Sequence, residues 1–130
     1  MMTVLAVAAG GAIGAVGRYA LTGWAERLLS AWLGGGPPYG TLAVNVIGSF
    51  LLGVLVETLA LSLSVAPEFR ALLVIGVLGG FTTFSAFSLD TVLLIERGEL
   101  GRAAFYVLLS VALSVGSLFA GLRLMRLVLS

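Results

Sequence analysis

Neutral polar side chains stand at helical spacing inside two apolar stretches of this sequence. In the first, Thr41, Asn45 and Ser49 recur every four residues, so a helix would place them on one face. In the second, hydroxyl groups follow at intervals of four, four and three residues, at Tyr106, Ser110, Ser114 and Ser117. Amide and hydroxyl donors can replace the water around a small anion. These two stripes therefore favour a pathway for such an ion.

Each stripe also has a purely structural explanation. A single asparagine often only joins neighbouring membrane helices, and serine hydroxyls often bond their own backbone. Enzyme chemistry has less support, because the sequence has no cysteine, no histidine, and no carboxylate pair or nucleophile beside a base. Without cysteine and histidine, the chain cannot form disulfides and lacks the usual zinc ligands. We therefore expect that the protein is not an enzyme.

The stretch from Gly79 to Phe87 is poorly suited to the middle of a membrane helix. Adjacent glycines and threonines disfavour a continuous helix, and the hydroxyls of Thr82, Thr83 and Ser85 offer the backbone other partners. Unpaired backbone groups are costly in lipid, so irregular backbone survives there only inside protein or beside water. We predict a helix break at membrane depth, with carbonyls free for a cation and N–H groups free for an anion. A tight glycine packing site is the alternative.

Aromatic and charged residues accompany this stretch. If the helix resumes after the break, Phe84 and Phe87 share a face, where their positive ring edges can meet an anion. The alternative is that both rings are only bulk. Arg18 lies at buried depth in an apolar run, where a charge faces a partner or an aqueous cavity unless it extends to the membrane interface. Asp90, one turn beyond Phe87, falls at the mouth of the predicted pathway.

The elements that must position these residues are membrane helices. Hydrophobic residues make up 60% of the 130-residue chain and charged residues 10%, against about 25% charged in soluble domains. The mean hydropathy is +1.18. We predict one all-α integral membrane domain with both termini on the same side. Its four transmembrane helices cover roughly residues 3–24, 41–64, 70–95 and 102–127, and the third is broken at mid-membrane.

The charges around these segments give no preferred orientation. Three arginines lie on the side of the termini (Arg70, Arg123 and Arg126) and three on the other (Arg27, Arg97 and Arg102), with no lysine. Basic residues in short loops normally set the orientation. The balance predicts insertion both ways and pairing with an inverted copy, although a weak bias from the free N-terminus is the alternative. A net charge of +1 without a basic run argues against a nucleic-acid partner.

Three motifs in this order resemble the Fluc, or CrcB, family of bacterial and archaeal fluoride channels. They are Gly10–Tyr19, Asn45–Gly53 and Gly79–Ser85, and the resemblance spans all four segments. It implies an antiparallel dual-topology homodimer in the cytoplasmic membrane, with two pores that each use both subunits. It also implies that the protein exports fluoride passively and lowers its concentration in the cytoplasm.

The resemblance further implies roles for individual residues. Asn45 corresponds to the asparagine that binds fluoride, and Phe84 and Phe87 to the phenylalanines whose ring edges meet the ion. The polar track of the fourth helix corresponds to Tyr106, Ser110 and Ser114. The family holds a central structural sodium ion through backbone carbonyls at positions matching Gly79 and Thr82. Arg18 and Asp90 are assigned to the pore vestibule, although some family members have glutamate where this chain has Asp90.

Two other functions remain open. A small-multidrug-resistance-type exporter also has four helices and dual topology, but it needs a membrane-embedded carboxylate in the first helix, where this chain has Arg18. A structural subunit of a larger complex would not need the two polar stripes. Fluoride efflux from liposomes that contain only the purified protein separates the three functions.

Overall fold

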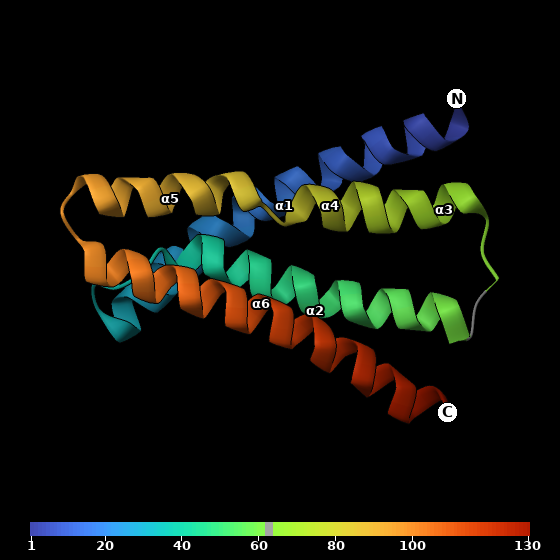
Figure 1. Cartoon of the computed structure of the whole chain (residues 1–130). Helices are drawn as coiled ribbons and strands as arrows, with labels where there is room; N and C mark the ends of the chain where they lie inside the picture. The colour runs from blue at the N-terminus through green and yellow to red at the C-terminus, as the bar shows by residue number, and fades with distance from the viewer. Residues whose placement is uncertain (62–63) are drawn as a thin grey trace.

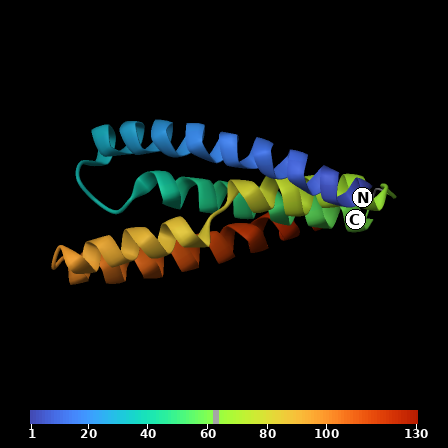
Figure 2. The ribbon, with the colours of Figure 1, turned by 90° about the horizontal axis from the view of Figure 1, so that it is seen from above.

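The computed structural model describes residues 1–61 and 64–130, and within these ranges all regular structure is helical. The same ranges contain four helical segments long and apolar enough to cross a membrane: Met2–Leu33, Tyr39–Leu61, Pro67–Glu96 and Leu100–Leu129. Both chain termini lie at the same end of the bundle (Figures 1 and 2). The predicted all-α membrane fold with four spans is confirmed.

The ends of the first two spans differ from the expected ones. Helix α1 (Met2–Leu33) continues beyond Trp24, because the residues that follow favour helix, and it ends at Gly34, where φ is 76°. Helix α2 (Tyr39–Leu61) was expected to extend to about residue 64; residues 62–63 lie outside the described part of the chain.

The third span is built from four consecutive pieces. They are α3 (Pro67–Ala71), a π-helix η1 (Leu72–Leu78), α4 (Gly79–Phe81) and α5 (Phe84–Glu96). Between α4 and α5 the backbone is extended, with ψ of 157° at Thr82 and φ of −152° at Thr83. Figure 1 shows α4 and α5 end to end with a non-helical link between them. The predicted break is confirmed, and it lies at the two threonines; the two glycines before it are helical.

The threonine hydroxyls satisfy backbone groups on both sides of the break. Thr82 Oγ1 donates to the carbonyl of Leu78 at 3.1 Å, at the end of α4. Thr83 is the N-cap of α5, and its Oγ1 accepts from Ala86 N–H at 3.1 Å. The cap at Thr83 reduces the cost of interrupting the helix at membrane depth, whereas the Leu78 carbonyl also accepts from the N–H of Thr82.

Glycines let α1 lie directly against the first half of the third span. A Cβ at Gly14 would overlap the carbonyl oxygen of Val77 and stand 2.8 Å from Phe81 N. A Cβ at Gly10 would stand 2.9 Å from the Cα of Gly76. The small-xxx-small spacing of Gly10 and Gly14 predicts a close approach of two helix backbones, and the structure shows this approach.

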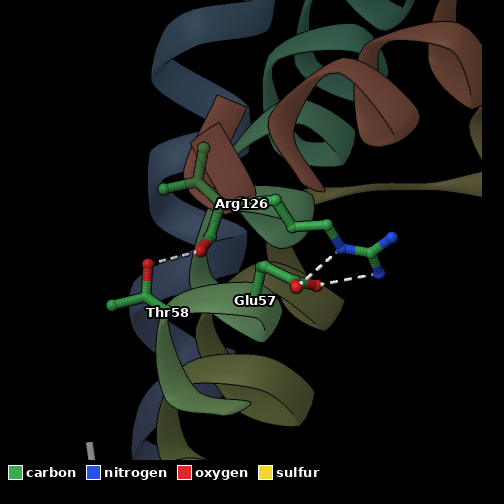
Figure 3. A network of polar contacts seen from close by, with 4 residues as sticks. Glu57, Thr58 and Arg126 are labelled. Atoms are coloured by element: carbon green, nitrogen blue, oxygen red, sulfur yellow. Dashed lines mark hydrogen bonds and ion pairs between the residues drawn. The ribbon is translucent and has the colours of Figure 1, made fainter. Parts of the chain in front are cut away.

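Helix α6 (Leu100–Leu129) packs on α2 along a contact that we call the α2–α6 seam. A Cβ at Gly121 would overlap the carbonyl oxygen of Phe50, so the two backbones touch. Further along, Arg126 Nε donates to Glu57 Oε1 at 2.7 Å, and Nη2 to Oε2 at 3.3 Å (Figure 3). The beginning of α6 instead continues from α5 through a tight turn at Gly98, where φ is 77°. The seam and this turn place α6 between α2 and α5.

Candidate ion pathway

A cavity of about 290 Å³ opens beside the break, and we call it the break cavity. It lies between α2, the extended link, α5 and α6. Its lining includes five residues predicted to contact an ion: Asn45, Phe84, Phe87, Ser110 and Ser114. Ser49, Thr82, Thr83, Val111 and Val115 complete it. The helical spacing of the two polar stripes therefore brings residues far apart in sequence to one space.

Asn45 holds the break in place. Its Oδ1 accepts from Thr83 N–H at 2.7 Å, and its Nδ2 donates to the Thr83 carbonyl at 3.0 Å. The carboxamide thus pairs both backbone groups of a residue that has left the helix. A carboxamide carries two N–H donors, so one of them remains for a ligand. Gly48, one turn further along α2, leaves room for this contact, since a Cβ there would stand 2.9 Å from the ring of Phe81.

Thr83 was named in the sequence analysis as a hydroxyl that offers the backbone a partner, but not as a residue of the pathway. Its backbone bonds Asn45, its side chain caps α5, and it borders the break cavity. A threonine just before a resumed helix is a common N-cap signal and would have identified the capping role. The bond to Asn45 depends on a contact between distant segments, which no local pattern shows.

Ser110 has a buried hydroxyl that is not used within the subunit. The residue is 5% exposed, and in residues 1–61 and 64–130 its Oγ is the one buried side-chain N or O atom without a hydrogen-bond partner. Leaving a buried hydroxyl unpaired is unfavourable, and such groups often have a ligand or water as partner. Ser110 borders the break cavity, and its Oγ is buried directly behind that lining.

Two phenylalanine rings form one wall of the same cavity. The ring centroids of Phe84 and Phe87 are 5.5 Å apart, and the ring planes are tilted by 47°. The shared face expected for these residues is therefore present. Phe84 is 78% exposed in the single chain, so its side of the cavity is open.

Tyr106 and Asp90 meet each other away from the break cavity. Tyr106 is fully buried, its hydroxyl donates to Asp90 Oδ2 at 3.1 Å, and neither residue lines the cavity. The ring of Tyr106 packs on Phe87 with a centroid distance of 5.3 Å. Tyr106 and Asp90, both predicted for the pathway, therefore lie behind the lining of the break cavity and not in it.

A second and larger cavity of about 720 Å³ lies between α1, α2 and the start of α5. We call it the arginine cavity, because Arg18 and Arg27 both line it. Thr83 borders both cavities, so they adjoin at the break. Arg18 lines this cavity, and its role in the vestibule stays a prediction.

Glu26 also lines the arginine cavity, and the sequence reasoning did not identify it. One carboxylate oxygen accepts from Gly40 N–H at 2.7 Å, at the beginning of α2, and the other accepts from Ser30 Oγ at 3.2 Å. The carboxylate therefore compensates a backbone donor at the first turn of α2. Its negative charge lies next to the positive end of that helix.

The carbonyls of Gly79 and Thr82 fit the donor set that a sodium ion needs. In a continuous helix they would accept from the N–H groups of Thr83 and Ala86. Those two donors are bonded instead to the Asn45 side chain and to Thr83 Oγ1. A helix break of this kind leaves backbone carbonyls for an alkali cation. The residues present are thus compatible with the sodium ion that the family resemblance implies.

The chain is similar to known proteins over nearly its whole length. The family model described as CrcB-like protein, Camphor Resistance (CrcB), matches residues 5–122. A protein of Rhodospirillum centenum named fluoride-specific ion channel FluC is 59% identical over 126 residues, which are 97% of each chain. An Agrobacterium fabrum protein of the same name is 55% identical over 128 residues, which are 97% of this chain and 98% of the relative. Both relatives carry the name of a channel and not of an enzyme, in agreement with the expectation from the sequence.

Proposed function

This chain belongs to the CrcB-like family, and we propose that it is a fluoride-specific channel that exports fluoride passively across the cytoplasmic membrane. The observation that carries the proposal is the break cavity. Its lining combines Ser110, whose buried hydroxyl has no partner in the described part of the chain, Asn45, which has a spare amide N–H, and the rings of Phe84 and Phe87. The relatives named as fluoride-specific channels support fluoride as the anion.

The proposed pathway uses neutral donors in succession. Fluoride enters the arginine cavity, where Arg18 provides a positive charge, and passes Thr83 into the break cavity. There Asn45 and Ser110 replace part of its water shell with fixed N–H and O–H dipoles. Ser114 continues this track along α6, one helical turn further.

Tyr106 and Asp90 have an indirect role in this proposal. Tyr106 packs against Phe87 and donates to Asp90, so it fixes the orientation of the ring at the wall of the break cavity. Asp90 thereby belongs to the vestibule through its bond to Tyr106.

The proposed active form is an antiparallel homodimer with two pores. Phe84 is mostly exposed in the single chain, and an inverted second copy would supply the missing side of the break cavity. The balanced arginine count supports insertion in both orientations. We propose that one structural sodium ion lies between the subunits, held by the carbonyls of Gly79 and Thr82 from each.

Fluoride efflux from liposomes that contain only the purified protein tests this function, with chloride efflux as the specificity control. Phe84→Ile removes the ring quadrupole at similar volume, and Asn45→Asp places a negative charge beside the anion. Both variants should lower fluoride efflux at least about tenfold, equivalent to roughly 1.4 kcal/mol in the barrier.

The assembly of each variant is checked by size-exclusion chromatography, because Asn45 also bonds the break. Wild-type efflux from correctly assembled variants would remove these residues from the pathway. Equal fluoride and chloride efflux from the wild-type protein would contradict fluoride specificity.

A further inference from the structure

The guanidinium of Arg18 extends to the helix break from the arginine cavity. Its Nη1 lies 3.5 Å from the carbonyl oxygen of Thr82, which is longer than a usual N–H···O hydrogen bond. No carboxylate of residues 1–61 and 64–130 lies within ion-pair distance of Arg18. The guanidinium is therefore held at the break by one long contact, beside a cavity of about 720 Å³.

The same Thr82 carbonyl oxygen is a proposed sodium ligand. A guanidinium that donates to this oxygen and a sodium ion that coordinates it would place two positive charges within a few ångströms of each other. At that distance they repel strongly. Each of the two cations is therefore bound more weakly while the other is on the oxygen.

We propose that Arg18 and sodium compete for the Thr82 carbonyl, and that bound sodium moves the Arg18 guanidinium into the arginine cavity, where it attracts fluoride. This inference rests on the proposed function and adds a coupling between its two ions. Glu26 lines the same cavity, but its carboxylate is bonded to Gly40 and Ser30 and so is less available to Arg18. By linkage, fluoride in the cavity must then strengthen sodium binding as much as sodium strengthens fluoride binding.

Sodium binding measures the competition without any flux. A ligand that binds only the folded protein stabilises it by RT ln(1 + [L]/Kd), so the rise of the thermal midpoint with sodium concentration reports the dissociation constant for sodium. Purified protein is titrated with sodium gluconate at constant ionic strength, with N-methylglucamine as the replacing cation. We expect Arg18→Gln, which keeps a donor and removes the charge, to bind sodium about tenfold more tightly than the wild type. Arg18→Lys, which keeps the charge, should stay close to the wild type.

Arg27→Gln is the matched control. Arg27 lines the same cavity but lies roughly 14 Å further along α1, by the rise of an α-helix. The sodium affinity of the Arg27→Gln variant should equal that of the wild type. A similar gain in both glutamine variants would mean a general charge effect and would overturn the competition at Thr82.

The second measurement replaces gluconate by fluoride in the wild-type protein. Fluoride should lower the dissociation constant for sodium several-fold in the wild type and leave it unchanged in Arg18→Gln. Unchanged or weaker sodium binding in Arg18→Gln would overturn the inference. If Arg18→Gln does not fold, the wild-type measurement is sufficient by itself. An absence of any fluoride effect on sodium binding in the wild type would then overturn the inference. A wild type without any sodium dependence rejects the sodium site and this inference together, whereas the channel function is decided separately by liposome efflux.

Discussion

The two halves of α6 are built differently, although both contact α2. The C-terminal half packs on α2 through glycine backbones, and there Ser117 Oγ shares its hydrogen between the carbonyls of Val46 at 3.0 Å and Ser114 at 2.9 Å. The N-terminal half faces α5 through aromatic rings and borders the break cavity, where the Ser110 hydroxyl has no partner in the described part of the chain.

This difference separates residues that look equivalent in sequence. Ser110 and Ser117 belong to one stripe on one helix, yet the hydroxyl of Ser110 has no hydrogen-bond partner in the described part of the chain, whereas that of Ser117 joins two helices. The deciding factor is the distance to the neighbouring helix. Glycines close the α2–α6 seam, whereas Phe87 and Tyr106 keep α5 away from α6 and leave room for an ion. We therefore expect changes in the seam to affect assembly and changes beside the break cavity to affect conduction.

Filling the seam should have the largest effect. A Cβ at Gly53 would overlap the carbonyl oxygen of Leu118 and stand 3.1 Å from Leu122 N. Both are backbone atoms that cannot move aside. Gly53→Leu should therefore cost more than about 3 kcal/mol and prevent recovery of folded protein. Size-exclusion chromatography and thermal unfolding in detergent measure this outcome.

Gly101→Leu is the control for that change, since no atom of the described residues lies within 4 Å of a Cβ built at Gly101 on α6. This variant should assemble normally. Normal assembly of Gly53→Leu as well would show that the seam tolerates separation, and the contrast between the two halves of α6 would be lost.

The two serines test the contrast directly. Ser110→Ala removes a hydroxyl that has no hydrogen-bond partner in the described part of the chain, so the thermal midpoint should not fall, while fluoride efflux should drop about tenfold. Ser117→Ala removes a hydrogen bond in the seam and should cost about 1 kcal/mol of stability, with efflux close to the wild type. The reverse pattern in the same efflux and unfolding measurements would assign the structural role to Ser110.

Much of this architecture can be predicted from the sequence. Composition and segment lengths predict the four spans, and the motif from Gly79 to Phe87 predicts the break. Helical periodicity brings Asn45 and Ser49 of α2 and Ser110 and Ser114 of α6 to one cavity, because each pair lies on one face of its helix.

The remaining features depend on how close neighbouring segments come. The glycine pair was expected to break the helix, but a Cβ at Gly80 would stand 2.8 Å from the carbonyl oxygen of Gly11, so this glycine serves close packing while the threonines make the break. The two explanations offered for that stretch are therefore both realised, at different residues. The bond between Asn45 and Thr83 and the π-helix before the break likewise have no signal in local sequence.

The smallest effect is expected at the far end of the seam. Arg126 pairs with Glu57 there. The Glu57 side chain is 10% exposed and the Arg126 side chain is 56% exposed. A half-exposed ion pair contributes at most about 1 kcal/mol, because water and salt screen it. Arg126→Gln should lower the thermal midpoint slightly, with less effect at high salt. Fluoride efflux should be unchanged, since neither residue borders the break cavity or the arginine cavity.

A double-mutant cycle with Glu57→Gln isolates the contribution of the ion pair, and the coupling energy between the two residues should vanish as salt is raised. A large loss of efflux in Arg126→Gln would instead make the seam part of the conduction pathway.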